Sequence, residues 1–202
     1  RIMSVITISG QVGSGERTIA RRVARSLGYK YVDRGIFEEV LKEYGIVDFR
    51  DLLDSPLHFL DRLAGDKRNT ADLLNKMYLL FAKKNNIVIQ SRRAFLVLDP
   101  FINVLNAFLK GPLAVRIQDV MKTEGISERA ASDYIDKEEQ IRIKIIESFY
   151  KKKWDSIAPW TLVLNTHKLG LDLVETILID SNAQVSTFDE AIGWQDGFPT
   201  ID

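Results

Sequence analysis

The sequence reads Gly10-Gln11-Val12-Gly13-Ser14-Gly15-Glu16-Arg17-Thr18 where a first apolar segment passes into a first amphipathic one. Residues 5–8 before it are β-branched and mostly apolar, which predicts one buried strand. After it, apolar residues recur with the spacing of one helix face as far as Leu27, and Gly28 is placed to end that helix. The sequence therefore predicts a strand, a glycine-rich loop and a helix in direct succession.

A glycine-rich turn that leads into a helix is suited to hold phosphate. Glycines allow a tight turn whose successive N–H groups point at one anion, and the helix start adds unpaired N–H groups and the positive end of its dipole. Gly10 and Gly15 have the spacing of the common phosphate-loop pattern G-x-x-x-x-G-K-[ST]. Glu16 stands where that pattern has lysine, and Thr18 comes one position after its hydroxyl residue. Two interpretations stay open on these residues: a phosphate loop in which Arg17 supplies the positive charge, or a turn that binds nothing.

The composition excludes several classes of site. The chain has 202 residues, enough for one compact domain with a sizeable core. It carries 28 basic and 28 acidic residues, so no global field favours nucleic acid or a membrane, and any anion site must be local. The absence of cysteine excludes disulfides, thiolate metal sites and a cysteine nucleophile, and the two histidines lack the spacing of metal ligands.

No apolar run approaches the length that spans a membrane, and no cleavable signal is visible. We therefore expect a soluble cytoplasmic protein without a nucleic-acid or membrane partner. The sequence does not determine the oligomeric state, and a monomer is compatible with it.

Charged residues follow two further predicted strands at their carboxyl ends, where ligands sit in open α/β sheets. Asp33 and Arg34 follow a strand over residues 29–32, and Arg92 and Arg93 follow a strand over 87–89. Asp33 can cap the next helix, line a site, or do both. For the two arginines we favour anion binding over a capped helix start, because solubility does not explain two arginines at the end of a buried strand.

The order of elements predicts an α/β fold. Strands and helices alternate along the chain, which favours a five-stranded parallel sheet with helices on both faces. The remaining predicted strands are residues 104–109 and 160–164, and the remaining predicted helices are residues 36–44, 70–81, 94–98, 113–124, a charged helix after Ser127, and 171–179.

Two charged regions each allow two interpretations. Residues 47–69 are either a helical insertion that covers a site or a solvated loop and helix pair. The helical hairpin that starts at Leu113 is either a closing lid or a simple solvated hairpin.

Several motifs resemble the cytidylate kinase-like family of P-loop proteins, which are related to nucleoside monophosphate kinases. Residues 13–22 look like its segment G-S-G-G-R-E-I-A-R-R. The family pattern often lacks the loop lysine and carries arginine where Arg17 stands, but it has glycine at the positions of Glu16 and Ser91. The resemblance covers about residues 4–180. Further matches keep their order and spacing at residues 27–29, 31–34, 91–94, 111–117 and 125–127, at Glu139 with Arg142, and at residues 149–150, 154–155 and 164–166.

The resemblance implies a three-layer P-loop kinase fold in a single domain, residues 1–202. Its core would comprise about residues 1–45, 86–115 and 155–180. A helical insertion that binds the nucleoside monophosphate would span about residues 46–85, a lid about 116–152, and a C-terminal tail without an assigned role 181–202.

The resemblance also implies roles in phosphoryl transfer from ATP with Mg²⁺. Arg92 and Arg34 would hold the acceptor monophosphate, and Asp33 would help to position either the acceptor or a magnesium-bound water. Arg17 would supply the catalytic cation that the missing lysine does not, and Arg116 and Arg142, brought in by lid closure, would stabilise charge on the transferring group. Thr18 would contact Mg²⁺ through its hydroxyl. The donor phosphates would be held by Gly10, Gly13, Ser14, Gly15, Glu16, Arg17 and Thr18.

Three functions are compatible with these features. The first is a nucleoside monophosphate kinase, with CMP or dCMP as the first acceptors to test. The second is a kinase of the same architecture that acts on another small metabolite, because the fold does not determine the acceptor. The third is a nucleotide-binding protein without transferase activity, which Glu16 makes credible.

Overall fold

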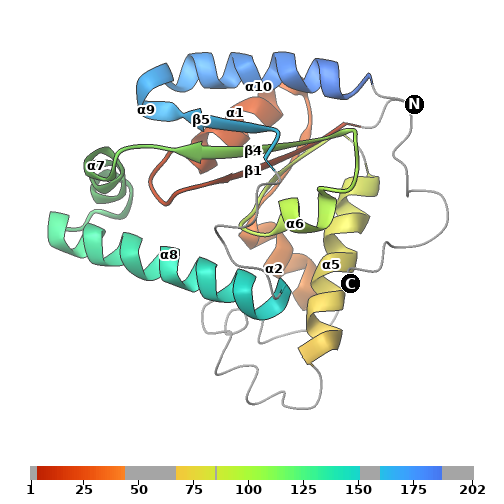
Figure 1. The fold of residues 1–202 in the computed structure, drawn as a ribbon, viewed down its shortest axis with the longest axis horizontal. Coiled ribbons are helices and arrows are strands. Elements are labelled where there is room, and N and C mark those ends of the chain that lie inside the picture. The colour runs from red at the N-terminus through yellow and green to blue at the C-terminus, as the bar shows by residue number, and fades with distance from the viewer. Residues whose placement is uncertain (1–3, 44–66, 85, 151–159, 188–202) are drawn as a thin grey trace.

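The computed structural model describes residues 4–43, 67–84, 86–150 and 160–187. Its described strands form one parallel sheet in the order β2-β3-β1-β4-β5 (Figure 1). The strands are β1 (Val5–Gly10), β2 (Lys30–Val32), β3 (Ile87–Gln90), β4 (Val104–Lys110) and β5 (Leu162–Asn165). The fold class predicted from the alternating elements is confirmed.

The central strand is β1, and all of its residues are buried. It pairs on one side with β3, where Ile8 lies opposite Gln90, and on the other with β4, where Ile8 lies opposite Ala107. This register brings the carboxyl ends of the three strands to one edge of the sheet. The glycine-rich loop and the polar residues after β3 therefore emerge side by side.

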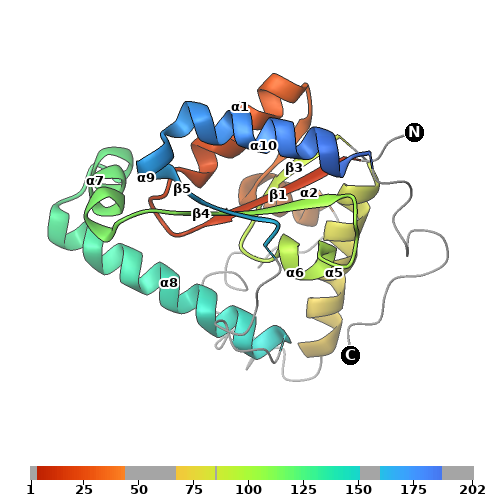
Figure 2. The same ribbon diagram turned by 45° about the horizontal axis from the view of Figure 1, so that its top comes forward.

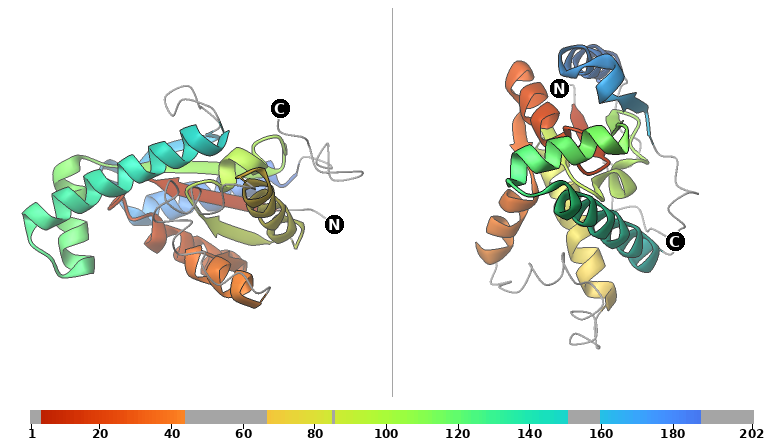
Figure 3. Two further views of the ribbon diagram at one scale, coloured as in Figure 1. Left: turned by 90° about the horizontal axis from the view of Figure 1, so that it is seen from below. Right: turned by 90° about the vertical axis from the view of Figure 1, so that its left-hand side faces the viewer.

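Helices cover both faces of the sheet, and a helical hairpin lies beyond its carboxyl edge (Figures 1 and 2). One face carries α1 (Glu16–Leu27) and α10 (Leu171–Val185). The opposite face carries α2 (Arg34–Glu43), α5 (Lys67–Lys83) and α6 (Ala94–Leu98). The hairpin consists of α7 (Leu113–Glu124) and α8 (Glu128–Tyr150), and the short helix α9 (Thr166–Leu169) connects β5 to α10. The left view of Figure 3 shows α8 starting beyond the end of the sheet and running back along the strands.

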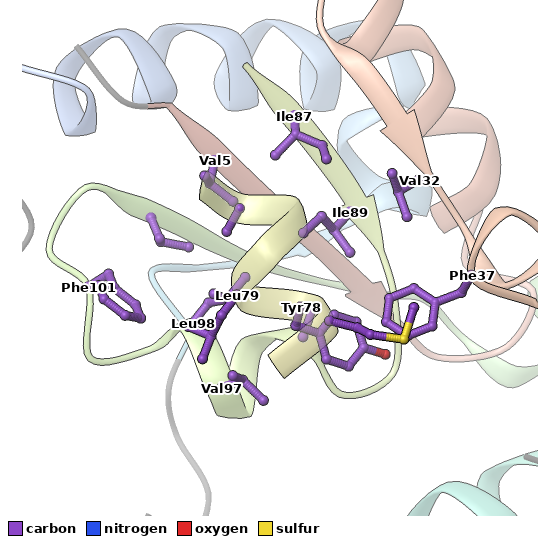
Figure 4. Packing of buried hydrophobic residues seen from close by; sticks show 14 residues of the cluster. Val5, Val32, Phe37, Tyr78, Leu79, Ile87, Ile89, Val97, Leu98 and Phe101 are labelled. Atoms are coloured by element: carbon purple, nitrogen blue, oxygen red, sulfur yellow. The ribbon is translucent and has the colours of Figure 1, made fainter. Parts of the chain in front are cut away.

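The alternation of side chains along the strands divides the core into two layers. Ile6 and Ile8 of β1 pack with the helices α1 and α10. Val5, together with Ile87 and Ile89 of β3, packs against the helices of the other face (Figure 4). A third, smaller cluster lies outside the sheet, where Val12 of the loop packs against α7 and α8.

Some element boundaries differ from the prediction. The last helix runs to Val185 instead of ending at residue 179, because Asn182 is buried and its side chain accepts a hydrogen bond from Ser4 Oγ at 2.8 Å. The predicted tail therefore begins with helical residues. Helix α5 begins at Lys67 rather than at residue 70, and α9, which the side chain of Asn165 caps, was not predicted. Residues 46–66 of the predicted insertion lie outside the described residues.

None of the helices in the described ranges combines the length and the apolar character that crossing a bilayer would need.

Candidate active site

A cavity of about 430 Å³ opens at the carboxyl edge of the sheet. Its walls come from the glycine loop, the start of α2, helix α5, the segment after β3, and the helices α7 and α8. Segments far apart in the sequence thus face one space, as the strand order requires. The candidate residues that line it are Gly10, Gly13, Gly15, Glu16, Arg17, Thr18, Asp33, Arg34, Arg92 and Arg142.

The shape of the loop depends on glycine at two positions. Gly13 and Gly15 have φ values of +80° and +83°, in the left-handed region that residues with a Cβ rarely adopt. A Cβ on Gly13 would also lie 2.5 Å from the carbonyl oxygen of Arg116. Gly15 is the N-cap of α1, so the first N–H groups of this helix have no partner inside it. They are available to an anion in the cavity.

Glu16 places a carboxyl group at the first residue of α1, on the cavity wall. Its Oε2 accepts a hydrogen bond from Ser14 Oγ at 3.2 Å. Burial raises the pKa of Glu16 above its ordinary value, although its own N–H group and the charges of Arg142 and Arg92 oppose that shift. The loop therefore carries an acidic group among the donors that would bind a phosphate.

Arg142 reaches the loop from α8 and is 2% exposed. Its Nη2 donates to the carbonyl oxygen of Gly10 at 2.5 Å, and its Nη1 lies 3.7 Å from Glu139 Oε2. Burial lowers the pKa of Arg142, and the carboxylates of Glu139 and Glu16 oppose this. The structure thus brings Arg142 to the cavity wall, where its charge faces the loop.

Arg116, which was predicted to act after lid closure, contacts the loop from α7 in this structure. It is 8% exposed and is not part of the cavity lining. Its Nε donates to the carbonyl oxygen of Gly111 at 3.1 Å, and its Nη1 donates to that of Val12 at 3.2 Å. The side chain therefore supports the loop at Val12 and joins it to Gly111, which follows β4, from outside the cavity lining.

Two residues without a predicted role also hold the loop. Glu139 Oε1 accepts the Val12 N–H group at 2.9 Å. Thr166 Oγ1 donates to the carbonyl oxygen of Ser14 at 2.8 Å. The sequence offered one signal for each, because both lie in motifs that match the cytidylate kinase-like pattern. Nothing local in the sequence indicates the contacts, which span more than a hundred residues.

The opposite wall carries the residues predicted for the acceptor. Arg92 Nη2 pairs with Glu138 Oε2 of α8 at 2.5 Å. Arg34 is exposed and pairs with Glu38 one turn along α2. Asp33 Oδ1 accepts the Ile36 N–H group at 3.2 Å, so it caps α2 while it also lines the cavity. A second hollow of about 340 Å³ adjoins this wall and is also lined by Arg17.

Two aromatic residues of the core form an aromatic wall of the cavity. The ring centroids of Phe37 and Tyr78 are 4.7 Å apart, and both residues line the cavity. The Tyr78 hydroxyl lies 2.7 Å from Ser91 Oγ, which also accepts the N–H groups of Arg93 and Ala94. A flat apolar ligand group can pack on this wall while its charged part contacts the arginines.

The described side chains do not form a metal site of their own. Nowhere in the described ranges do three or more His, Cys, Asp or Glu side chains gather around one point that could hold a metal ion. A divalent cation at this cavity would therefore take most of its oxygen ligands from bound phosphates and water, as Mg²⁺ commonly does. The exposed side chain of Thr18 lines the cavity and can add one hydroxyl ligand.

The family match and the sequence relatives both point to cytidylate kinases. Residues 5–168 match the model of the cytidylate kinase-like family. The chain is 31% identical over 179 residues to a cytidylate kinase of Pyrobaculum calidifontis, a match that covers 88% of this chain and 92% of the relative. It is 30% identical to a cytidylate kinase of Ignicoccus hospitalis, and this match covers 87% of this chain and 97% of the relative.

Solved structures show the same fold. An uncharacterized protein from Eubacterium ventriosum superposes with a TM-score of 0.68 at 22% identity, over 90% of this chain and 99% of that one. A shikimate kinase from Bacteroides thetaiotaomicron superposes with a TM-score of 0.54 at 16% identity, over 89% of this chain and 98% of the kinase chain.

Proposed function

The chain belongs to the cytidylate kinase-like family, and from this membership we propose that it transfers a phosphoryl group from ATP to a nucleoside monophosphate, CMP or dCMP being the first acceptors to test. The observation that carries the proposal is the single cavity that the glycine loop shares with Arg92 and Arg142. Phosphoryl transfer asks a protein for positioning, neutralisation of charge and exclusion of water, and a cavity with cations on both walls is suited to these tasks.

On the donor side, the loop would hold the phosphates through its N–H groups. Arg142 would neutralise charge on the transferring group, since it is buried beside Gly10. Arg17 is exposed at the cavity wall and would add a second positive charge. Arg116 would act indirectly, through the carbonyl groups that it holds behind the loop. The loop residues that would hold the donor phosphates are Gly10, Gly13, Ser14, Gly15, Arg17 and Thr18.

On the acceptor side, Arg92 and Arg34 would bind the monophosphate and Asp33 would help to position it. The base would pack on the wall formed by Phe37 and Tyr78. Mg²⁺ would enter with the donor phosphates and contact Thr18; when bound, it would neutralise phosphate charge. Because ATP and nucleoside monophosphates are intracellular metabolites, we expect the reaction in the cytoplasm. The predicted division into core, insertion, lid and tail is kept as part of this proposal.

A second candidate is a nucleotide-binding protein without transferase activity. Glu16 favours it, because its carboxyl group lies on the wall that the donor phosphates would occupy.

The test measures ADP release from ATP over a panel of acceptors that includes CMP, dCMP, UMP, AMP and small hydroxyl metabolites. We expect turnover with CMP or dCMP. Arg92→Ala should then raise the acceptor KM and lower kcat/KM about a hundredfold, because a charge-assisted contact is lost. Arg129→Ala is the matched control, since this exposed arginine lies on the same helix as Glu138 but outside the cavity lining.

Each other outcome points to another function. ATP binding without turnover on any acceptor would favour the second candidate. Turnover only with an acceptor that is not a nucleotide would indicate a kinase of another small metabolite. An Arg92→Ala variant with unchanged kinetics would contradict the assigned acceptor site.

A further inference from the structure

Glu139 connects α8 to the main chain of the glycine loop. Its Oε1 accepts the Val12 N–H group at 2.9 Å and lies 3.5 Å from Arg116 Nη1. Its Oε2 lies 3.7 Å from Arg142 Nη1. One carboxylate therefore accepts a loop N–H group and faces two guanidinium groups. Each of these binds a loop carbonyl: Arg116 that of Val12 and Arg142 that of Gly10.

The side chain of Val12 joins the same contact surface. It is 7% exposed and packs against Val120 of α7 and against Ala131 and Ile135 of α8. The N–H group, the carbonyl group and the side chain of this one residue are thus all held by the hairpin. The loop cannot change its conformation at Val12 without leaving the hairpin.

Electrostatics make Glu139 the central member of this group. Arg116 and Arg142 are both buried, and like charges in a low-dielectric environment repel strongly. The carboxylate of Glu139 lies between them and compensates one of the two charges. Without it, the guanidinium groups would repel each other and lose the geometry in which they bind the loop carbonyls.

We propose that Glu139 is a positioning residue for the donor site, which holds the glycine loop in its phosphate-binding conformation and keeps Arg142 oriented toward it. The proposal rests on the phosphoryl transfer proposed above. It explains how a loop without lysine presents a cation to the donor: the charge comes from α8, and Glu139 keeps it in place. Glu139 is not part of the cavity lining, so it acts through other residues.

The first experiment measures the loop directly. Hydrogen exchange of peptides that cover residues 10–15 is followed in the ligand-free protein for the wild type, Glu139→Ala, Glu139→Gln and Glu147→Ala. We expect faster exchange at Val12 in Glu139→Ala. Glu139→Gln should retain most of the protection, because its amide oxygen can still accept the N–H group. Glu147→Ala is the matched control, because Glu147 is exposed on the same helix.

The second experiment separates positioning from general destabilisation. We expect Glu139→Ala to raise the KM for ATP about tenfold, the effect of losing one charge-assisted hydrogen bond, while the KM for the acceptor is unchanged. Glu139→Gln should give a smaller rise. A purely structural defect would reduce the active fraction and hence kcat, and it would leave both KM values as they are.

The outcomes distinguish the two proposals. Equal exchange at Val12 in Glu139→Ala and Glu147→Ala would overturn the positioning role, even if the wild type is an active kinase. Equal rises of the KM values for ATP and acceptor would overturn it as well. If calorimetry showed that the wild type binds no ATP, the proposed function would be overturned, and so would the role of Glu139 at a donor site.

Discussion

Glu16 is the residue whose chemistry would conflict with that of a bound phosphate. It carries a carboxyl group at the first residue of α1, where the helix offers unpaired N–H groups and a positive dipole end. An incoming phosphate needs the same donors. If the cavity binds the donor phosphates as proposed, the Glu16 carboxyl would compete with them for these N–H groups and weaken nucleotide binding.

Replacing this carboxyl group should strengthen nucleotide binding. We expect Glu16→Gln to lower the Kd for ATP about tenfold, or about 1.4 kcal/mol, because one negative charge beside the phosphates is removed at nearly constant volume. Isothermal titration calorimetry measures this directly. Glu39→Gln is the control, since Glu39 is exposed on α2. An ATP affinity equal to that of the wild type would show that the carboxyl group does not compete.

Tyr31 predicts how stability changes at alkaline pH. Burial, followed by the charge of Asp33, raises the pKa of Tyr31 from 10.0 to about 12, although Arg21 opposes this shift. The folded chain therefore keeps the phenol proton at a pH where the unfolded chain has lost it. The stability from this group is fully present below about pH 10 and is lost as the pH rises through about 12.

The test of this dependence is urea unfolding of the wild type and Tyr31→Phe at pH 9 and pH 11. We expect the wild type to lose more stability between the two pH values than the variant, because phenylalanine has no proton to release. Parallel losses would show that the phenol of Tyr31 has the same pKa in both states.

The helices α7 and α8 act on the loop as one element. The hairpin contacts Val12 of the loop, so it would form part of the proposed donor site. The burial of Ala131, Ile135 and Arg142 does not fit a hairpin that is solvated on all sides. Closure of residues 116–152 over a bound nucleotide stays a prediction.

The short helix α6 depends on its first turn, because five residues contain few internal hydrogen bonds. Ser91 Oγ accepts the N–H groups of Arg93 and Ala94 and contacts the hydroxyl of Tyr78. We expect Ser91→Ala to lower the free energy of unfolding by about 1 kcal/mol, because the N–H groups of Arg93 and Ala94 lose the oxygen that accepts them. Chemical denaturation measures the change.

Tyr78→Phe is the control for this element, because it removes the hydroxyl contact with Ser91 but leaves the two hydrogen bonds that Ser91 Oγ accepts from N–H groups. Its effect on unfolding should be smaller than that of Ser91→Ala. Equal effects would mean that these two hydrogen bonds contribute nothing.

At the level of the complete chain, the cavity joins segments from both halves of the sequence. A ligand that binds there stabilises the folded state only, so the melting temperature depends on its concentration. With ATP and Mg²⁺ at a hundred times Kd, the gain is about 2.7 kcal/mol, which corresponds to about 5–10 °C for a chain of this length. Differential scanning calorimetry with and without ATP tests this.

Adenosine with the same Mg²⁺ concentration is the control for the phosphate contribution. If the loop binds the phosphates of ATP as proposed, adenosine should leave the melting temperature nearly unchanged. An equal rise with adenosine would show that the loop does not bind the polyphosphate.

Local patterns were sufficient for most of the fold. Short, mostly apolar runs, β-branched at residues 5–8 and 87–89, predicted the strands, and helical spacing with glycine stops predicted the main described helices, because both depend on residues close in sequence. The spacing of Gly10 and Gly15 placed the loop, and the cap at Asp33 was visible from one residue and its neighbours. The five-stranded parallel sheet followed from the order of these elements.

Long-range packing accounts for what could not be predicted. Arg116 and Arg142 look alike in the sequence, yet one supports the loop from behind and the other lines the cavity. Glu139 lies 127 positions from Val12, and Asn182 lies 178 positions from Ser4, so neither contact has a local signature. The direction of a long side chain depends on which carbonyl groups and charges the folded chain brings near it. Short-range patterns therefore identified the loop and its arginines, whereas the packing of α7 and α8 against the sheet edge assigned each arginine its partner.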